Sequence, residues 1–280
     1  MKVISLPYLV FICKCKRLPL KDLFVLFSHF LKIVFIFTIS CFDQVIFAGN
    51  DLSTLESNKI EMVDGLVKPP FIIEENGRGL QLDIVRSALA AVNKDIHFIH
   101  VPFGRTVTTF QRLNADGIVT VLSDYKHPNL FISNPYITYQ NVAVSLLENQ
   151  LSLEKIEDLS GKSMVAFQNA KKYLGEDFNK IIKYSMDYRE VAEQMKQIEL
   201  LFLHRTEVII LDINIFKYLL KHNTTARVSQ PFKVHYIFNE RQYSAAFKSE
   251  KNRDVFDQGI KTMKEQGTYQ IIVDKYLNQQ

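Results

Sequence analysis

The sequence predicts an α/β fold in which two similar blocks of strands and helices follow one another. In the first block, apolar and β-branched runs at 60–67, 96–101 and 118–121 predict strands, and the segments 80–92 and 105–114 between them predict helices. Strands that alternate with helices are typical of a parallel sheet with helices packed on its faces.

The second block repeats this order. It predicts strands at 141–147, 163–168 and 207–212, a helix that begins at 169, and helices at 189–198 and 213–222. Beyond residue 233 we expect two further strands (VHYIF and YSAAF), a helix at 255–266 that ends at Gly267, and a last helix containing Tyr269 and Tyr276. No low-complexity linker separates the blocks, which favours two lobes joined by strands over independent domains on a flexible tether.

The charge of the chain is unevenly distributed. The 280 residues are 47% hydrophobic and 23% charged, which suits one or two globular domains with a sizeable core. Residues 1–49 carry six Lys or Arg and two acidic residues, whereas the other 231 residues carry 28 basic and 28 acidic residues and are formally neutral. A neutral body argues against nucleic acid as a partner.

All three cysteines, Cys13, Cys15 and Cys41, lie in the N-terminal segment. The body of the protein therefore cannot use disulfides, thiolate metal ligands or a thiol nucleophile. The seven histidines are scattered, and no HExxH, Walker or GxSxG motif occurs. We expect no metal, no cofactor and no catalytic group.

The N-terminal segment has the pattern of a signal peptide. Lys32 is followed by the apolar run 33–39, and the small residue Ala48 offers a cleavage site. The sequence therefore predicts a leader at residues 1–48 and export of the remainder. This leader is longer than the usual ~15–30 residues, and a start near Leu31 would leave a compact one.

Two other interpretations of the same segment remain open. Residues 23–42 are long enough to span a bilayer as an uncleaved anchor. The sequence Thr38-Ile39-Ser40-Cys41 distantly resembles a lipoprotein box, which would place a lipid on Cys41.

Polar side chains follow the predicted strand in the stretch 117–136. Ser123 and Lys126 come directly after the apolar run, where an α/β sheet presents a ligand at its carboxyl edge, although a strand also ends in an ordinary polar turn. Arg105 opens a helix and either faces the same cleft or forms an exposed ion pair. Asp212 follows another strand and either contacts a ligand or caps the next helix.

Seven short motifs in this order resemble those of the family 3 extracellular solute-binding proteins, the periplasmic receptors of polar amino-acid ABC importers. They are Lys68-Pro69-Pro70-Phe71, Gly79-Leu80-x-Leu82-Asp83-Ile84, Asp116-Gly117, Phe131-x-Ser133-x-Pro135-Tyr136, Leu159-x-Gly161-Lys162, Asp212, and Gly267-x-Tyr269-x-x-Ile272-x-x-Lys275-Tyr276. The resemblance covers about residues 58–278.

The resemblance implies a two-lobed periplasmic-binding-protein-like fold of type II. Each lobe would be a mixed sheet flanked by helices, and two hinge strands, near 141–147 and 233–238, would join them. Lobe 1 would be residues 49–140 plus 240–280, and lobe 2 residues 141–239. A small polar solute would be held between the lobes of a monomer, and the partner would be an inner-membrane ABC permease.

The resemblance also implies which residues contact the solute. Lys126 stands where the family has an Arg that forks the ligand's α-carboxylate, and Ser123 stands where it has a Thr. Lysine keeps the charge but lacks the planar bidentate match, so we expect weaker or differently shaped carboxylate binding. Arg105 is a further candidate for the cleft.

In the second lobe, Asn169-Ala170-Lys171 stands where the family has a Gly-Thr pair whose backbone N–H groups and hydroxyl hold the same carboxylate. The Thr hydroxyl is missing from this sequence. Asp212 matches the family's carboxylate for the ligand's amino group. Phe71 matches an aromatic residue that lines the pocket.

The function expected from these residues is capture of a small polar solute, an amino acid or a related metabolite, without catalysis. Two alternatives stay open. One is an enzyme on the same scaffold, similar to the cyclohexadienyl dehydratases, and the other is a sensory ligand-binding module that does not serve transport.

Overall fold

The computed structural model describes residues 58–65, 68–73, 77–223 and 230–278. The predicted cleavage after Ala48, the alternative anchor at 23–42 and the alternative lipid on Cys41 lie outside these ranges. Within the described ranges, no helix combines the length and the apolar character needed to cross a membrane.

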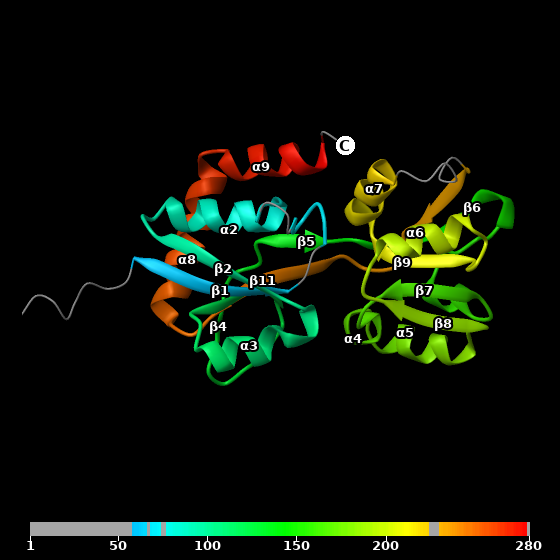
Figure 1. Ribbon diagram of the computed structural model, residues 1–280, viewed down its shortest axis with the longest axis horizontal. Coiled ribbons are helices and arrows are strands. Elements are labelled where there is room, and N and C mark those ends of the chain that lie inside the picture. Colours follow the sequence, from blue (N-terminus) through cyan, green and yellow to red (C-terminus); the bar gives the residue numbers. More distant parts are fainter. Residues whose placement is uncertain (1–57, 66–67, 74–76, 224–229, 279–280) are drawn as a thin grey trace, which may run out of the picture. The chain divides into compact units, whose positions relative to one another are not determined.

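The first sheet is mixed, with parallel strands at one side and antiparallel strands at the other (Figure 1). Its order is β2 (Asp95–Val101), β1 (Lys59–Gly65), β3 (Gly117–Leu122), β11 (Arg241–Phe247) and β4 (Phe131–Ile132), and β5 (Ile137–Tyr139) pairs with β11. Strand β1 runs parallel to β2 and β3, whereas β11 runs antiparallel to β3, β4 and β5. The parallel part is the one that the alternating sequence predicts.

The second sheet has the same mixed character. Its order is β10 (Phe232–His235), β6 (Asn141–Leu146), β9 (Val208–Asp212), β7 (Ser163–Phe167) and β8 (Asp187–Val191). Strand β7 runs parallel to β8 and β9, and β6 runs antiparallel to β9 and β10. The chain passes between the two sheets at Gln140, between β5 and β6, and again at residues 236–240.

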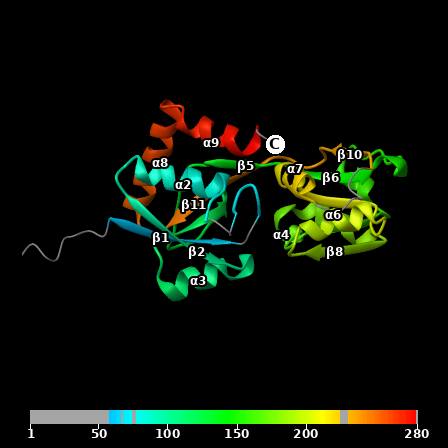
Figure 2. The ribbon, with the colours of Figure 1, turned by 45° about the horizontal axis from the view of Figure 1, so that its top comes forward.

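Helices cover both faces of each sheet (Figures 1 and 2). The helices of the first sheet are α2 (Leu80–Ala90), α3 (Thr106–Leu113), α8 (Glu250–Glu265) and α9 (Thr268–Leu277), and those of the second are α4 (Ala170–Tyr173), α5 (Glu176–Ile181), α6 (Met195–Phe202) and α7 (Ile213–His222). Short 3-10 turns lie at Phe103–Arg105, Leu147–Asn149, Ile156–Leu159 and Ile182–Tyr184. Helices α2, α8 and α9 pack on one another, and α3 packs on β1 and β3.

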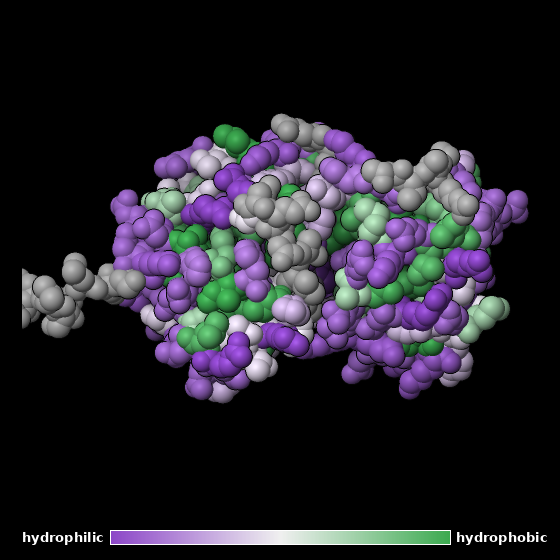
Figure 3. Space-filling model, in the orientation of Figure 1, coloured by the Kyte–Doolittle hydropathy of each residue, from purple (hydrophilic) through white to green (hydrophobic). Residues whose placement is uncertain are grey.

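The second sheet is buried on both faces because its central strands are apolar at most positions. In β6, Val142 and Val144 belong to the core cluster that contains α6 and α7, whereas Ala143 belongs to the cluster that contains Phe178 of α5. Continuous apolar runs of this kind are typical of strands with helices on both sides. The surface seen in Figure 3 is mostly hydrophilic, with apolar residues interspersed.

The predicted helix at 189–198 is wrong in its first half. Residues Asp187–Val191 form strand β8, which pairs with β7 in parallel, and α6 begins only at Met195. Strand β8 is the edge of the sheet, and its exposed side chains Asp187 and Arg189 form an ion pair at 2.9 Å. The polar sequence of an edge strand lacks the apolar run that marks the central strands, so pairing with β7 decides its structure.

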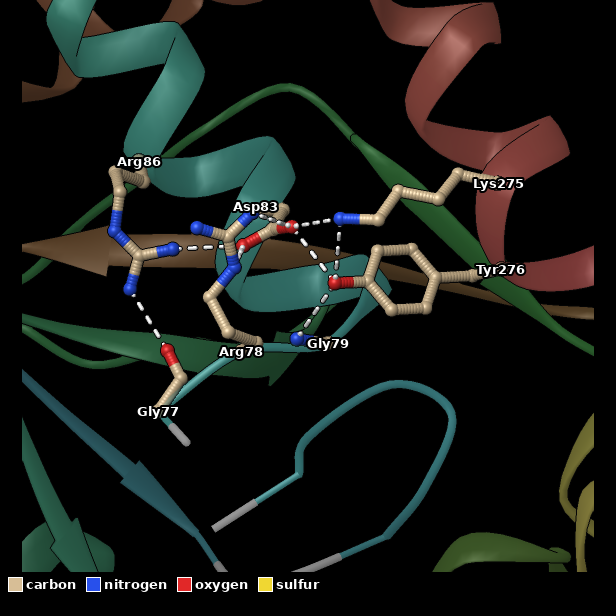
Figure 4. A network of polar contacts seen from close by, with 7 residues as sticks. All are labelled: Gly77, Arg78, Gly79, Asp83, Arg86, Lys275 and Tyr276. Atoms are coloured by element: carbon tan, nitrogen blue, oxygen red, sulfur yellow. Dashed lines mark hydrogen bonds and ion pairs between the residues drawn. The ribbon is translucent and has the colours of Figure 1, made fainter. Parts of the chain in front are cut away.

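The buried carboxylate of Asp83 attaches the last helix to the first turn of α2 (Figure 4). It accepts hydrogen bonds from Tyr276 Oη at 2.7 Å and Arg86 Nη1 at 2.7 Å, and contacts Arg78 Nε at 3.0 Å and Lys275 Nζ at 3.3 Å. Proximity to Tyr276 and Asp83 raises the pKa of Lys275. Asp83 therefore has a structural role, because its carboxylate joins α2 to α9.

Candidate functional site

A cavity lies where the carboxyl ends of strands from both sheets meet. It encloses about 810 Å³ of space free of protein atoms, part of which is open to solvent. Its lining comes from the first sheet and its loops (Gly65, Lys68, Thr120, Val121, Tyr139 and Tyr243) and from the second (Asn141, Phe167, Gln168, Tyr173, Ala192, Gln194, Asp212 and Ile215). Binding at the carboxyl ends of strands is the general rule for open α/β sheets.

Asp212 is the acidic residue of this lining and sits at a junction of the fold. It ends β9 and caps α7, and its Oδ1 accepts hydrogen bonds from the backbone N–H groups of Asn214 at 2.8 Å and Ile215 at 3.2 Å. Its Oδ2 accepts a third, at 2.8 Å, from the N–H of Gln140, where the chain passes between the sheets. Only 3% of Asp212 is exposed.

Burial raises the pKa of Asp212 from 3.8 to about 6, although the three backbone donors and Lys68 lower it. The folded state therefore favours the protonated form of the Asp212 carboxyl group. The protonated group stabilises the fold fully below pH 3.8, and this stabilisation is lost as the pH rises through 6. A shift of this size means that the ionised carboxylate costs roughly 3 kcal/mol in the folded protein near pH 7. An uncharged Ser or Asn would cap α7 without this cost, which favours a role for the charge beyond capping.

Lys68 is the basic residue of the lining. Burial lowers its pKa to about 8, against the opposing effect of the nearby carboxylates of Asp64 and Asp212. Its Nζ lies 4.9 Å from the centre of the Tyr139 ring. Asp64 is itself fully buried and contacts His100 Nδ1 at 2.8 Å. The charge of Lys68 is therefore offset by two carboxylates of the protein.

Aromatic rings form much of the remaining wall. Tyr139 and Tyr243 meet edge to face with ring centres 4.9 Å apart, and Phe167 and Tyr173 line the opposite side, which belongs to the second sheet. Phe71 is fully buried behind Tyr139 and stacks on it at 4.0 Å. These contacts hold the wall rigid and leave ring surface facing the cavity.

A buried hydrogen-bond network supports the wall on the side of the first sheet. Gln81 donates from Nε2 to Thr120 and, at 2.7 Å, to Tyr136, while its Oε1 accepts from the Tyr139 hydroxyl at 2.9 Å. Tyr136 donates in turn to the carbonyl of Val119 at 2.8 Å. The network fixes the positions of both Thr120 and Tyr139 in the lining.

Near the start of α4, the carboxylate of Glu190 accepts hydrogen bonds from backbone N–H groups. The N–H groups of Asn169 and Lys171 donate to the two carboxylate oxygens of Glu190, at 2.8 and 3.1 Å, and the hydroxyl of Tyr188 donates to the same carboxylate at 2.8 Å. Asn169 adopts a left-handed conformation with φ of 65°. The backbone donors that the resemblance assigns to the ligand's carboxylate are therefore already paired within the chain.

The predicted site residues occupy different surroundings. Asp212 lines the cavity, and Phe71 lies one layer behind it. Ser123 and Lys126 are exposed in the turn after β3, and Arg105 is exposed where α3 begins; none of the three belongs to the lining of this cavity. Their roles, like those of Asn169 and Lys171, stay predictions.

Several lining residues escaped the sequence analysis. Lys68 directly precedes two prolines near the end of a predicted strand, so a search for charges at strand ends would have found it. Tyr139 closes the short strand β5, which the sequence analysis does not predict. The sequence predicts a helix at Ala192 and Gln194, although these residues connect β8 to α6. No local signal identifies them as lining residues.

Known proteins share this fold. An ancestral arginine-binding protein bound to arginine is 20% identical over 78% of this chain and 98% of its own, with a TM-score of 0.64. A substrate-binding protein of an ABC uptake transporter from Streptococcus pneumoniae, with bound histidine, is 13% identical over 82% of this chain and 97% of its own, with a TM-score of 0.66. The ancestral amino-acid-binding protein AncCDT-1, a precursor of cyclohexadienyl dehydratase, is 16% identical over 79% and 95%, with a TM-score of 0.61.

These likenesses identify the fold class. The chain has the two-lobed periplasmic-binding-protein fold, with two mixed sheets flanked by helices, as predicted. No protein-family model and no curated protein matches the sequence.

Proposed function

We propose that this protein is a family 3 solute-binding receptor of the periplasm that captures a small polar solute in the cavity and delivers it to an inner-membrane ABC permease. The observation that carries the proposal is the buried carboxylate of Asp212, which is kept at a cost in stability at the carboxyl edge of both sheets. The fold neighbours support it, because they include amino-acid-binding proteins and a substrate-binding protein of an ABC transporter.

The proposed lobes are residues 49–140 plus 240–280 and residues 141–239, and they close on the solute as a monomer by bending at the two chain crossings. Gln140 lies in one crossing and donates to Asp212. A solute that contacts Asp212 therefore acts directly on this crossing, which couples binding to closure. Asp212 holds a cationic group of the solute, and Tyr139 and Tyr243 form its apolar wall.

An enzyme similar to the cyclohexadienyl dehydratases is a second candidate, because a carboxyl group with a pKa of about 6 suits general acid catalysis near neutral pH. The hydrogen bonds of Asp212 argue against it. Both carboxylate oxygens accept hydrogen bonds from backbone N–H groups. A catalytic proton on either oxygen would therefore compete with these N–H groups for the same lone pairs. We therefore favour binding without turnover.

A thermal-unfolding screen of the full chain tests the proposal. Amino acids, amines including polyamines, and organic acids are added singly at millimolar concentration, and turnover of prephenate and arogenate is assayed in parallel. A solute present at 100 times its Kd stabilises the folded state by about 2.7 kcal/mol, which raises Tm by several degrees. We expect at least one such shift and no turnover; a panel without any shift would contradict the receptor proposal.

A further inference from the structure

Glu190 lies at the border of the cavity and carries a second negative charge there. It is two residues before the lining residue Ala192, and one of its donors, Asn169, directly follows the lining residue Gln168. Three hydrogen bonds, from two backbone N–H groups and the Tyr188 hydroxyl, hold its carboxylate in place. The carboxylate therefore has a fixed position beside the cavity.

Four backbone N–H groups near the cavity that could bind an anion are already paired with carboxylates of the protein. The backbone donors at Asn169 and Lys171 are paired with Glu190, and those at Asn214 and Ile215 are paired with Asp212. Among the described residues of the lining, Lys68 is the one cation, and Asp64 and Asp212 offset its charge.

The same surroundings favour a cation. Asp212 lines the cavity, and Asp64 and Glu190 place two further carboxylates beside it, whereas Lys68 is the one cationic side chain of the described lining. Lys171 lies near Glu190, with its Nζ 5.1 Å from the centre of the Tyr188 ring. Aromatic rings attract organic cations through their negative faces, and four rings line the cavity: Tyr139, Phe167, Tyr173 and Tyr243. A carboxylate on the solute would meet negative charge and no unoccupied backbone donor at these positions.

We infer that the solute of this receptor is an organic cation without a carboxylate, an amine or a guanidine, and that Glu190 excludes the corresponding amino acids. The inference rests on the proposed function and specifies the class of solute that the site takes.

Matched pairs of solutes test the inference, because each pair differs only by the carboxylate. The pairs are agmatine and arginine, histamine and histidine, tyramine and tyrosine, and putrescine and ornithine. Affinities for the full chain are measured by titration calorimetry. We expect the decarboxylated member of the best-binding pair to bind at least about tenfold more tightly than the amino acid. A single charge contact readily changes Kd by this factor.

Glu190→Gln removes the charge but keeps the size and one acceptor oxygen. In this variant we expect the preference within the best-binding pair to shift toward the amino acid by at least about tenfold. Glu207→Gln is the matched control, because the Glu207 carboxylate also accepts a backbone N–H, from Ser163 at 2.8 Å, but Glu207 lies directly before β9 and does not line the cavity. The control variant should keep the wild-type preference.

The outcomes separate this inference from the proposed function. Tighter binding of the amino acids by the wild type, or an unchanged preference in Glu190→Gln, overturns the inference and leaves the receptor in place. If neither member of any pair binds but another class of solute raises Tm, the inference is also overturned and the receptor proposal stays. Absence of a shift with every class of solute overturns both.

Discussion

Asp212→Ala is expected to abolish the increase in melting temperature that the best solute gives to the wild-type protein. The substitution removes the one carboxylate of the described cavity lining, so the cationic group of the solute loses its partner in a buried setting. Loss of one member of such a charge pair weakens binding by about 100-fold or more. Thermal unfolding with and without the solute, followed by titration calorimetry, measures the effect.

The stability of the unliganded variant should change little, because two effects oppose each other. Losing the cap of α7 costs about 1 kcal/mol, whereas removing a carboxylate with a raised pKa relieves the cost of burying its charge. Asp158→Ala is the matched control, since Asp158 also accepts two backbone N–H groups, from Glu154 and Lys155, but does not line the cavity. A full melting shift in Asp212→Ala would remove Asp212 from the site.

Gly259→Ala is expected to destabilise the fold by about 3 kcal/mol, near the upper end for overpacking of a core. A Cβ atom at Gly259 of α8 would lie 2.0 Å from the carbonyl oxygen of Ala88 in α2, and backbone atoms cannot move aside as a flexible side chain can. The two helices must separate, which disturbs the core that both share. Chemical denaturation gives the free energy of unfolding.

Gly104→Ala is the control for this contact. A Cβ atom at Gly104 would meet no other atom within 4 Å, so its free energy of unfolding should stay within about 0.5 kcal/mol of the wild type. Equal stability of the two variants would show that α8 does not approach α2 as closely as the structure indicates.

The arrangement of strands and helices could be predicted largely from local sequence. Central strands such as VIILD, at 208–212, are apolar up to their last residue, Asp212, and the helices that follow them have an amphipathic period. Strand β8 could not be recognised, because its sequence DYREV is polar and its structure depends on pairing with β7. Contacts with other segments decide whether such a polar sequence forms an edge strand.

The candidate site could be predicted only in part, for a similar reason. Asp212 of the lining could be predicted because it ends a strand, which is a local feature. The pairing of Glu190 with Asn169 joins residues 21 positions apart, and no local pattern reveals it. The same holds for Lys68, whose place beside Asp212 depends on how the two sheets meet.

Hydrogen–deuterium exchange of the full chain, with and without the solute that raises the melting temperature most, tests the central claim most directly. The account predicts slower exchange on binding at the segments that border the cavity, namely 139–141, 167–169 and 212–215, and little change in α3 and α5. Binding that leaves these three segments unchanged would contradict the assignment of this cavity as the solute site.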